Sequence, residues 1–255
     1  MRIRTCLLCC VTLAPMAVLA DDPPPPPPQG VWTGKGQLGF LASQGNTQSS
    51  SANAAIDMGL LVDPWEHKFH LGGLYGKSAG VVAAERWDAN WQSNYDFTPV
   101  LFGFGALRYQ HDQFSGFQYQ ASETAGAGYK IINTGNTKLS AQAGVGYREL
   151  RPENLVKNGS GAVIARILLP TDNSVVFTAG LDYSQAFTST TTLSNKLLVE
   201  VGSGDKLITD TLALTVKMST RLALSLGYSL QDNTQPPAGL KKIDSVETAN
   251  LVFAF

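Results

Sequence analysis

Cysteine is missing from all but the first ten residues of this 255-residue chain. Cys6, Cys9 and Cys10 are the only three, and they fall in a segment that we expect to be removed during export. The remaining chain would then have no disulfide, no thiolate metal site and no cysteine nucleophile. Histidine is equally scarce, with three in the chain, which leaves few candidates for acid–base chemistry.

Net charge is low, charged residues are few, and long apolar runs are missing from most of the chain. Lys and Arg number 19 against 20 Asp and Glu, a formal net charge of −1, so the chain has no excess of cations with which to bind nucleic acid. Charged residues make up 15% and hydrophobic residues 44%, a balance that argues against disorder. Beyond residue 20 no apolar run approaches the length of a membrane-spanning helix.

The first 31 residues predict an export segment and a spacer. Arg2 and Arg4 precede an apolar run, and Val18-Leu19-Ala20 places small residues at a cleavage site. This is the pattern of a secretory signal peptide, over residues 1–20. Residues 21–31 include six consecutive prolines, which favour polyproline II. We expect a stiff periplasmic linker there, with a docking peptide as the alternative, and a single domain over residues 32–255.

After Trp32 the chain alternates between apolar and polar residues. The clearest stretch runs from Glu85 to Phe97, where aromatic side chains share one face and charged or amide side chains the other. A period of two is typical of a strand with one apolar face, and we find no convincing helix after the signal. The predicted strands are 32–43, 48–61, 67–77, 85–97, 101–112, 118–131, 138–150, 174–187, 192–202, 206–216, 220–231 and 244–255.

These twelve strands predict a closed barrel. They are long for a soluble protein, whose strands are commonly about 5–6 residues, and they approach the ~9–11 residues that cross a bilayer. Lipid offers no partner to the amides of an open sheet edge, so a spanning sheet must close. The predicted fold class is therefore all-β: a single-chain transmembrane antiparallel up-and-down β-barrel of about 12 strands, in the outer membrane of a Gram-negative cell. A β-sandwich is the alternative.

The segment 162–169 is apolar enough to be a thirteenth strand, but single-chain bacterial barrels usually have an even count. We therefore place 151–173 in one long outer loop, with a small hairpin of its own above the membrane. Short periplasmic turns are expected at 63–64, 98–99, 133–136, 188–191 and 218–219. Connections at 78–84, 113–117, 203–205 and 232–243 are expected on the outer side, with a tight one at Gly45-Asn46.

The polar faces of the strands predict the lining of the lumen. Both signs of charge are mixed there with amides, and twelve strands lie between the eight that side chains can fill and the 16–18 of aqueous porins. The lumen is thus expected to be either a narrow polar channel or a plugged, hydrogen-bonded core. The predicted lumen-lining residues are Arg86, Asp88, Asn90, Gln92, Asn94, Asp96, Gln118, Gln120 and Arg148, with Asp210 on the same side.

The last strand carries a separate signal. Leu251, Phe253 and Phe255 share one face, and Phe255 ends the chain. A terminal Phe that closes an apolar-alternating strand resembles the segment that the barrel assembly machinery reads, so we predict an assembly signal at these three residues.

A lipid hydrolase of the outer membrane is the enzymatic alternative, and it needs a His base beside a Ser nucleophile. His67 and His70 are three apart and face opposite sides of a strand, so they form no metal site. His111 has Asp112 and Ser115 nearby, which we interpret as ordinary loop chemistry. We therefore expect no enzyme activity, no catalytic residue, no metal and no cofactor.

Several short motifs near the two ends of the chain can be compared with a known family. They are Trp32-x-Gly34-x-Gly36, Gly39, Gly45-Asn46-Thr47, Leu212-Ala213-Leu214, Leu222-Ala223-Leu224, Gly227-Tyr228, Pro236-Pro237-Ala238-Gly239-Leu240-Lys241-Lys242-Ile243-Asp244 and Leu251-Val252-Phe253-Ala254-Phe255. These motifs resemble those of the salt-induced outer-membrane proteins, a bacterial family classed as a domain of unknown function. The match covers roughly 32–255, and the family usually has Thr where this chain has Ser245. The resemblance implies a barrel in the outer membrane and a link to salt or osmotic stress, and it supplies no catalytic residues.

The sequence therefore predicts a non-enzymatic outer-membrane barrel that acts as a narrow passive channel linked to salt or envelope stress. The alternative is a structural barrel with a plugged lumen that acts through its extracellular loops. Expected partners are outer-membrane lipid, lipopolysaccharide and the barrel assembly machinery. The basic loop of Lys241 and Lys242 is the expected contact for lipopolysaccharide, with a merely solvated loop as the alternative. No nucleic acid partner is expected, and a monomer is favoured.

Overall fold

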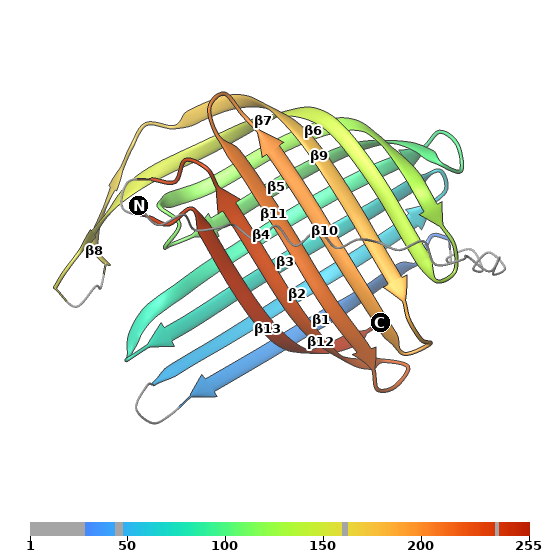
Figure 1. Ribbon diagram of the computed structural model, residues 1–255, viewed down its shortest axis with the longest axis horizontal. Coiled ribbons are helices and arrows are strands. Elements are labelled where there is room, and N and C mark those ends of the chain that lie inside the picture. The colour runs from blue at the N-terminus through green and yellow to red at the C-terminus, as the bar shows by residue number, and fades with distance from the viewer. Residues whose placement is uncertain (1–28, 44–47, 160–162, 238–239) are drawn as a thin grey trace, which may run out of the picture.

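The computed structural model describes residues 29–43, 48–159, 163–237 and 240–255 (Figure 1). The predicted signal peptide, the six prolines and the predicted turn at Gly45-Asn46 lie outside these ranges. Within them no helix is long and apolar enough to cross a membrane. The strands are β1 (Trp32–Ser43), β2 (Ser49–Val62), β3 (Trp65–Ser78), β4 (Val81–Asp96), β5 (Leu101–Asp112), β6 (Phe117–Asn133), β7 (Thr137–Lys157), β8 (Val163–Leu168), β9 (Asp172–Ala186), β10 (Thr191–Val201), β11 (Lys206–Lys217), β12 (Leu222–Asn233) and β13 (Ile243–Ala254).

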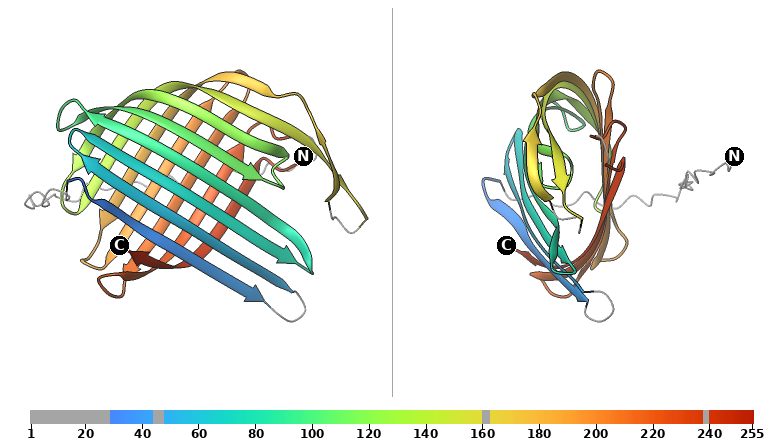
Figure 2. Two further views of the ribbon diagram at one scale, coloured as in Figure 1. Left: turned by 180° about the vertical axis from the view of Figure 1, so that it is seen from behind. Right: turned by 90° about the vertical axis from the view of Figure 1, so that its left-hand side faces the viewer.

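Twelve of these strands form one closed antiparallel ring. Sequential strands pair from β1 to β7, β7 then pairs with β9, the order continues to β13, and β13 pairs with β1. The predicted all-β barrel of 12 strands is thus confirmed. Figure 2 shows that the ring is flattened, with β1–β4 in one wall and β11–β13 in the wall opposite.

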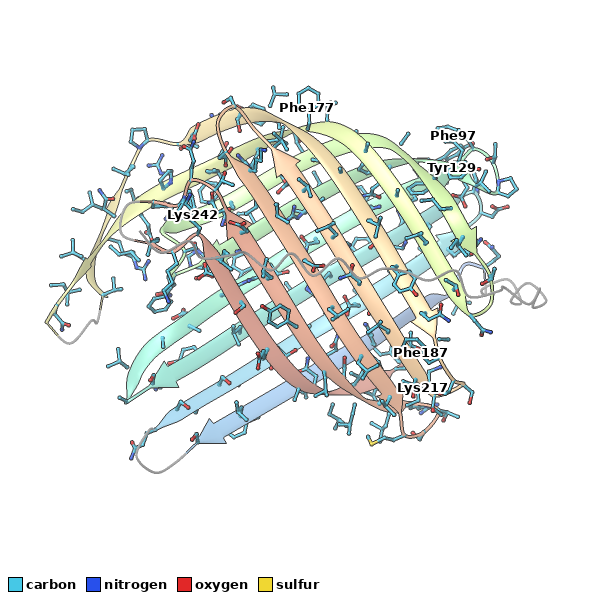
Figure 3. All side chains as sticks on the ribbon, viewed as in Figure 1. Phe97, Tyr129, Phe177, Phe187, Lys217 and Lys242 are labelled. Carbon is cyan, nitrogen blue, oxygen red and sulfur yellow. The ribbon has the colours of Figure 1, made fainter. Side chains whose placement is uncertain are left out.

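The strands form because their residues alternate, and the barrel turns the apolar set outward. Leu38 and Phe40 on β1 are 68% and 75% exposed, and Phe177 on β9 is 66% exposed. In Figure 3 Phe177 projects from the outer surface, while Phe97 and Tyr129 lie together toward one end of the barrel. An outer wall of exposed large apolar side chains is far more extensive than the patches of soluble monomers.

The two ends of the barrel differ. At the turn end, which comprises residues 63–64, 97–100, 134–136, 187–190 and 218–221, the connections are short. The other connections gather at the loop end. The predicted connection 78–84 is wrong in length, because Val81 and Val82 already pair with β3 and only Ala79 and Gly80 turn, both with positive φ.

The predicted loop 151–173 is mostly a two-stranded ribbon. β7 continues beyond the barrel to Lys157 and pairs there with β8, which pairs with no other strand of the described chain. Within the predicted segment 162–169, β8 (Val163–Leu168) is therefore a hairpin strand outside the ring, as the even strand count required. Arg166 on β8 donates to Glu153 and, at 2.9 Å, to the carbonyl of Gln113, which ties the ribbon to the neighbouring connection.

The buried apolar side chains lie inside the barrel and fill part of it. Phe102 and Phe104 on β5 are 4% and 7% exposed. Their rings occupy the space beside Gly128 and Gly144, where an added Cβ would lie 2.1 Å from the Phe102 ring and 3.1 Å from the Phe104 ring. These two glycines therefore permit the close approach of the rings to the wall.

The join between the first and last strands is shorter than the other pairings. Only Lys35 to Leu38 are in register with β13, whereas β1 pairs with β2 along its whole length. Two backbone hydrogen bonds between Gly34 and Phe255, at 3.0 and 2.9 Å, extend the join to the chain's last residue. We call this pairing the seam.

Candidate functional site

The candidate site is the polar lining of the barrel interior. Inward positions are identified by contacts between side chains on strands that are not neighbours, because such contacts can form only across the inside. Gln92 on β4 donates to Gln142 on β7 at 3.1 Å. This contact fixes the even-numbered residues of β4 as inward, and their outward neighbours include Trp87 and Trp91.

His70 is the centre of the first inward cluster. Its Nδ1 lies 2.6 Å from Asp57 Oδ1 and its Nε2 lies 3.2 Å from Asp88 Oδ2. Only an imidazolium can donate from both ring nitrogens. Gln37 also donates to Asp57 at 2.9 Å, and Lys35 Nζ lies 3.6 Å from the same carboxylate. Four neighbouring strands, β1 to β4, thus share one hydrogen-bonded network.

A second cluster lies nearer the turn end. Asn94 accepts from Gln92 at 2.9 Å and donates to Glu66 at 3.1 Å. Glu66 in turn pairs with Lys68 at 3.0 Å. Farther along the same wall Lys130 on β6 pairs with Asp96 at 2.6 Å, across β5.

The third set of contacts crosses the lumen near the loop end. Arg108 on β5 lies 3.0 Å from Glu200 on β10, whose side chain is only 3% exposed. Gln110 on β5 donates to Gln231 on β12 at 3.5 Å. Because β5 is separated from β10 and β12 by several strands of the ring, these pairs join opposite walls and narrow the interior.

Arg148 completes this narrow region. Its guanidinium donates to both carboxylate oxygens of Asp205 at 2.5 and 2.6 Å, and its side chain is 3% exposed. Asp205 belongs to the connection between β10 and β11, so the pair holds that connection over the mouth of the barrel.

The structure places most of the predicted lining residues inward. Arg86 lies 3.8 Å from Asp88, and Asn90 donates to Asp88 at 3.1 Å. Gln120 is in register with the inward Gln110. Gln118 is different, because a register irregularity at Phe117–Tyr119 leaves it outside the strand ladder, so alternation does not fix its face.

Asp210 was predicted inward, and that prediction is wrong. It is in register with Leu197 and in phase with Leu212 and Leu214 on the outer face of β11. Its carboxylate accepts from Asn195 at 2.6 Å. The error arose because Asp210 was assigned to the inner face from its polarity alone. Its position in the alternation of β11, in step with outward apolar residues, gives the opposite face.

Sequence reasoning missed several members of the lining. Lys35, Asp57 and His70 are in phase with the polar faces of their strands, so alternation could have found them. Arg108 and Glu200 could not have been paired in this way, since their contact depends on the closure and flattening of the ring.

The other candidates from the sequence lie apart from this lining. His111 contacts the carbonyl of Gln118 through Nδ1, and the Ser115 hydroxyl donates to the carbonyl of Asp112 at 2.9 Å. The hydroxyl of Ser115 is thus directed at backbone rather than at His111. His67 lies on the outer face, stacked between Trp65 and Trp91.

The predicted assembly signal lies on the outer face of β13. Leu251, Phe253 and Phe255 are 48%, 46% and 55% exposed. In the basic loop, Lys241 and Lys242 are exposed, and Figure 3 shows Lys242 toward the loop end, away from Lys217 at the turn end.

Comparison with known proteins identifies the family. Residues 36–255 match the family described as "Protein of unknown function, DUF481". The chain belongs to this family. The resemblance to a bacterial family of unknown function is thereby confirmed. A relative, the uncharacterized protein YdiY of Escherichia coli K12, is 24% identical over 210 residues, which cover 78% of this chain and 73% of YdiY.

Two solved structures have a similar arrangement of strands. The COG4313 outer membrane channel from Pseudomonas putida F1 is 10% identical with a TM-score of 0.48, over 89% of this chain and 96% of the other. The translocator domain of the autotransporter NalP from Neisseria meningitidis is 14% identical with a TM-score of 0.45, over 88% and 86%. Because both similarities are low, the fold is assigned from the strand pairing of this chain and not from these structures.

Proposed function

We propose that this protein is a narrow, non-enzymatic diffusion channel of the bacterial outer membrane, for small polar solutes and ions. The apolar exterior supports insertion in a bilayer, because a closed ring leaves no backbone amide unpaired in lipid. The export signal and the terminal Phe255 in the sequence support the outer membrane as the location.

The observation that carries the channel proposal is the exposure of charged side chains inside the ring. Lys35 and Lys68 point inward, yet their side chains are 51% and 55% exposed, and Asp57 and His70 remain about one-third exposed. Inward groups at this level can be exposed only if the interior next to β1–β4 is open toward the turn end. A polar space of this kind favours water and small solutes over apolar compounds.

Mixed charge supports weak ion selectivity. Carboxylates such as Asp57 and Glu66 alternate along the lining with cations such as Lys35 and Lys68. A single-sign ring, which selects ions by charge, is not formed by these clusters. We therefore expect a passive channel with little preference between small cations and anions.

Conductance across planar bilayers tests the proposal. The purified mature protein should give small, stepwise currents that rise with salt concentration. Absence of current at every salt concentration, from protein shown to be folded and inserted, would contradict the channel. That result would favour a structural barrel with a closed lumen, for which the Arg108–Glu200 contact across the interior is the supporting observation.

The assembly role proposed for Phe255 is tested by its deletion. We expect the shortened chain to accumulate in the periplasm instead of the outer membrane, because both the exposed terminal ring and part of the seam are lost. Replacement by Tyr, which keeps an aromatic end, is the matched control. Normal membrane levels of the deletion variant would contradict the assigned signal.

A role in salt or envelope stress is also part of the proposal, and it is supported by the family resemblance in the sequence. A strain without the protein should grow more slowly than its parent after a shift to high salt. Complementation by the intact gene, but not by a chain that fails to insert, would attribute the defect to the barrel.

A further inference from the structure

The outer wall formed by β4 to β7 contains a hollow of about 650 Å³. This wall faces the viewer in the left view of Figure 2. Gly103, Gly105 and Ala125 line the hollow where neighbouring positions carry large side chains, and Trp91 and Tyr147 border it. Its volume falls within the range of small-molecule sites, and its lining is mostly apolar.

Glu123 places a carboxylate at this hollow. On the outer face it lies between Leu107 and Tyr147, with which it is in register. Its side chain is exposed, and no described residue forms a hydrogen bond or ion pair with it. By contrast Asp210, the carboxylate on the outer face of β11, has Asn195 as its partner.

Two polar groups lie beneath the surface of the hollow without a partner in the described chain. Ser93 is 8% exposed, it lines the hollow, and its hydroxyl has no hydrogen-bond partner among the described residues. The indole Nε1 of the adjacent Trp91 is likewise buried and unpartnered within the described chain. Buried polar groups without partners are uncommon, because each loses its hydrogen bond to water.

The hollow has room for an occupant. A Cβ added at Gly105 would meet no heavy atom within 4 Å. At Gly103 an added Cβ would lie 3.0 Å from the Phe97 ring, which marks the far wall. The open space therefore extends from Glu123 over Gly105 toward the turn end.

Glu123 lies near a group of aromatic side chains on the outer wall, toward the loop end of the barrel. Tyr109 stacks on Trp87 at 4.9 Å and on Tyr119 at 5.8 Å, and Tyr109 is in register with Ala121, two residues from Glu123. Aromatic belts mark the headgroup level of a membrane. A ligand with its polar head at Glu123 would therefore extend its apolar part into the bilayer.

We propose that this hollow binds a slender, bilayer-dissolved amphiphile with an amino head group. Its ammonium group pairs with Glu123, and its chain lies over Gly105 and Ala125. An acyl chain alone provides the carboxylate with no partner, and an anionic head group is repelled by it. The proposal rests on the membrane insertion proposed above and is independent of an open lumen.

A second copy of the chain matches the hollow less well. The cations on the outer face, such as Lys77 and Lys206, lie at strand ends, away from the level of Glu123. A neighbouring barrel therefore offers no cation at the depth where the carboxylate requires one.

Tryptophan fluorescence tests the proposal directly, because Trp65 and Trp91 line the hollow. The full mature barrel is inserted in phosphatidylcholine vesicles and titrated with bromine-labelled dodecylamine, dodecanol or dodecanoate. We expect saturable quenching, with the amine binding about tenfold more tightly than the alcohol and the carboxylate weakest.

Two variants and two matched controls identify the site. Gly105→Leu fills the space and should abolish saturable quenching by all three probes. Glu123→Gln should bring the amine and the alcohol to about equal affinity. Gly36→Leu, at another outward glycine with open space around its Cβ, and Asp210→Asn, at another outward carboxylate, should both leave amine binding unchanged.

Three results would overturn the proposal. These are the absence of a saturable component, equal quenching in Gly105→Leu, and cross-linking between barrels through the hollow without any preference for the amine. Insertion is checked first by resistance to protease, so failure to insert would count against the proposed membrane location, whereas insertion without amine binding would count against the hollow alone.

Discussion

His70 shows how single side chains hold the wall of β1–β4 together. It lies between Asp57 and Asp88 and has a ring nitrogen directed at each. Without a cation between them, the two carboxylates would repel each other. Because these groups remain partly exposed, the contribution of the cluster to stability is moderate.

We therefore expect His70→Gln to lower the free energy of unfolding by about 1–2 kcal/mol. Urea titration of the vesicle-inserted barrel, followed by tryptophan fluorescence, measures the change. His67→Gln is the matched control, since His67 lies on the outer face of the same strand and should alter stability by only about 0.5 kcal/mol. Equal effects of the two substitutions would contradict the role given to the cluster.

For most of the predicted lining residues, the sequence correctly indicated that the side chain faces the inside of the barrel. The exceptions have physical causes. Asp88, Asn90 and Gln92 could be placed inward because residues 85–97 alternate without interruption. Gln118 was predicted to face inward as well, but a bulge breaks the phase at this point, so alternation does not fix its face. Asp210 was misplaced because its hydrogen bond with Asn195, which makes its outward position tolerable, involves another strand.

Among the elements, the ribbon of β7 and β8 is the one that lies outside the barrel. It joins the rest of the protein through the continuation of β7 and through Arg166, which contacts Glu153 and Gln113. The even strand count predicted its exclusion from the ring. The sequence did not reveal that β7 continues unbroken into it, since residues 151–157 lack a clear alternation.

Removal of the ribbon should leave the barrel intact. We expect a chain in which 154–168 are replaced by Gly-Ser, together with Glu153→Gln to avoid an unpaired buried carboxylate, to keep its fold. Retention of the shift in gel mobility between unheated and boiled samples measures this. A shortened chain that no longer resists unfolding in detergent would show that the ribbon contributes to barrel stability.

For the whole molecule, flattening of the ring decides how wide the lumen is. It brings Arg108 to Glu200 and Gln110 to Gln231 from opposite walls. Strand number could be predicted from the sequence, but the width could not, because contacts across the interior depend on how the closed ring is shaped.

The Arg108–Glu200 pair should therefore limit the current. We expect the double substitution Arg108→Ala and Glu200→Ala to raise single-channel conductance several-fold at fixed salt, by widening the constriction. Removing both partners avoids leaving one buried charge unpaired. Lys68→Ala, at an exposed position inside the same barrel, serves as the comparison and should change conductance little.

The short join between β1 and β13 gives the cylinder a weakest line along its length. Fewer ladder bonds must break there than anywhere else around the circumference, so local opening would begin between Gly34 and Leu38. Deuterium uptake at those amides should lead that of the other strands. The same line is where an incoming polypeptide or lipid could part the wall sideways, and where a newly made chain would complete its circle last.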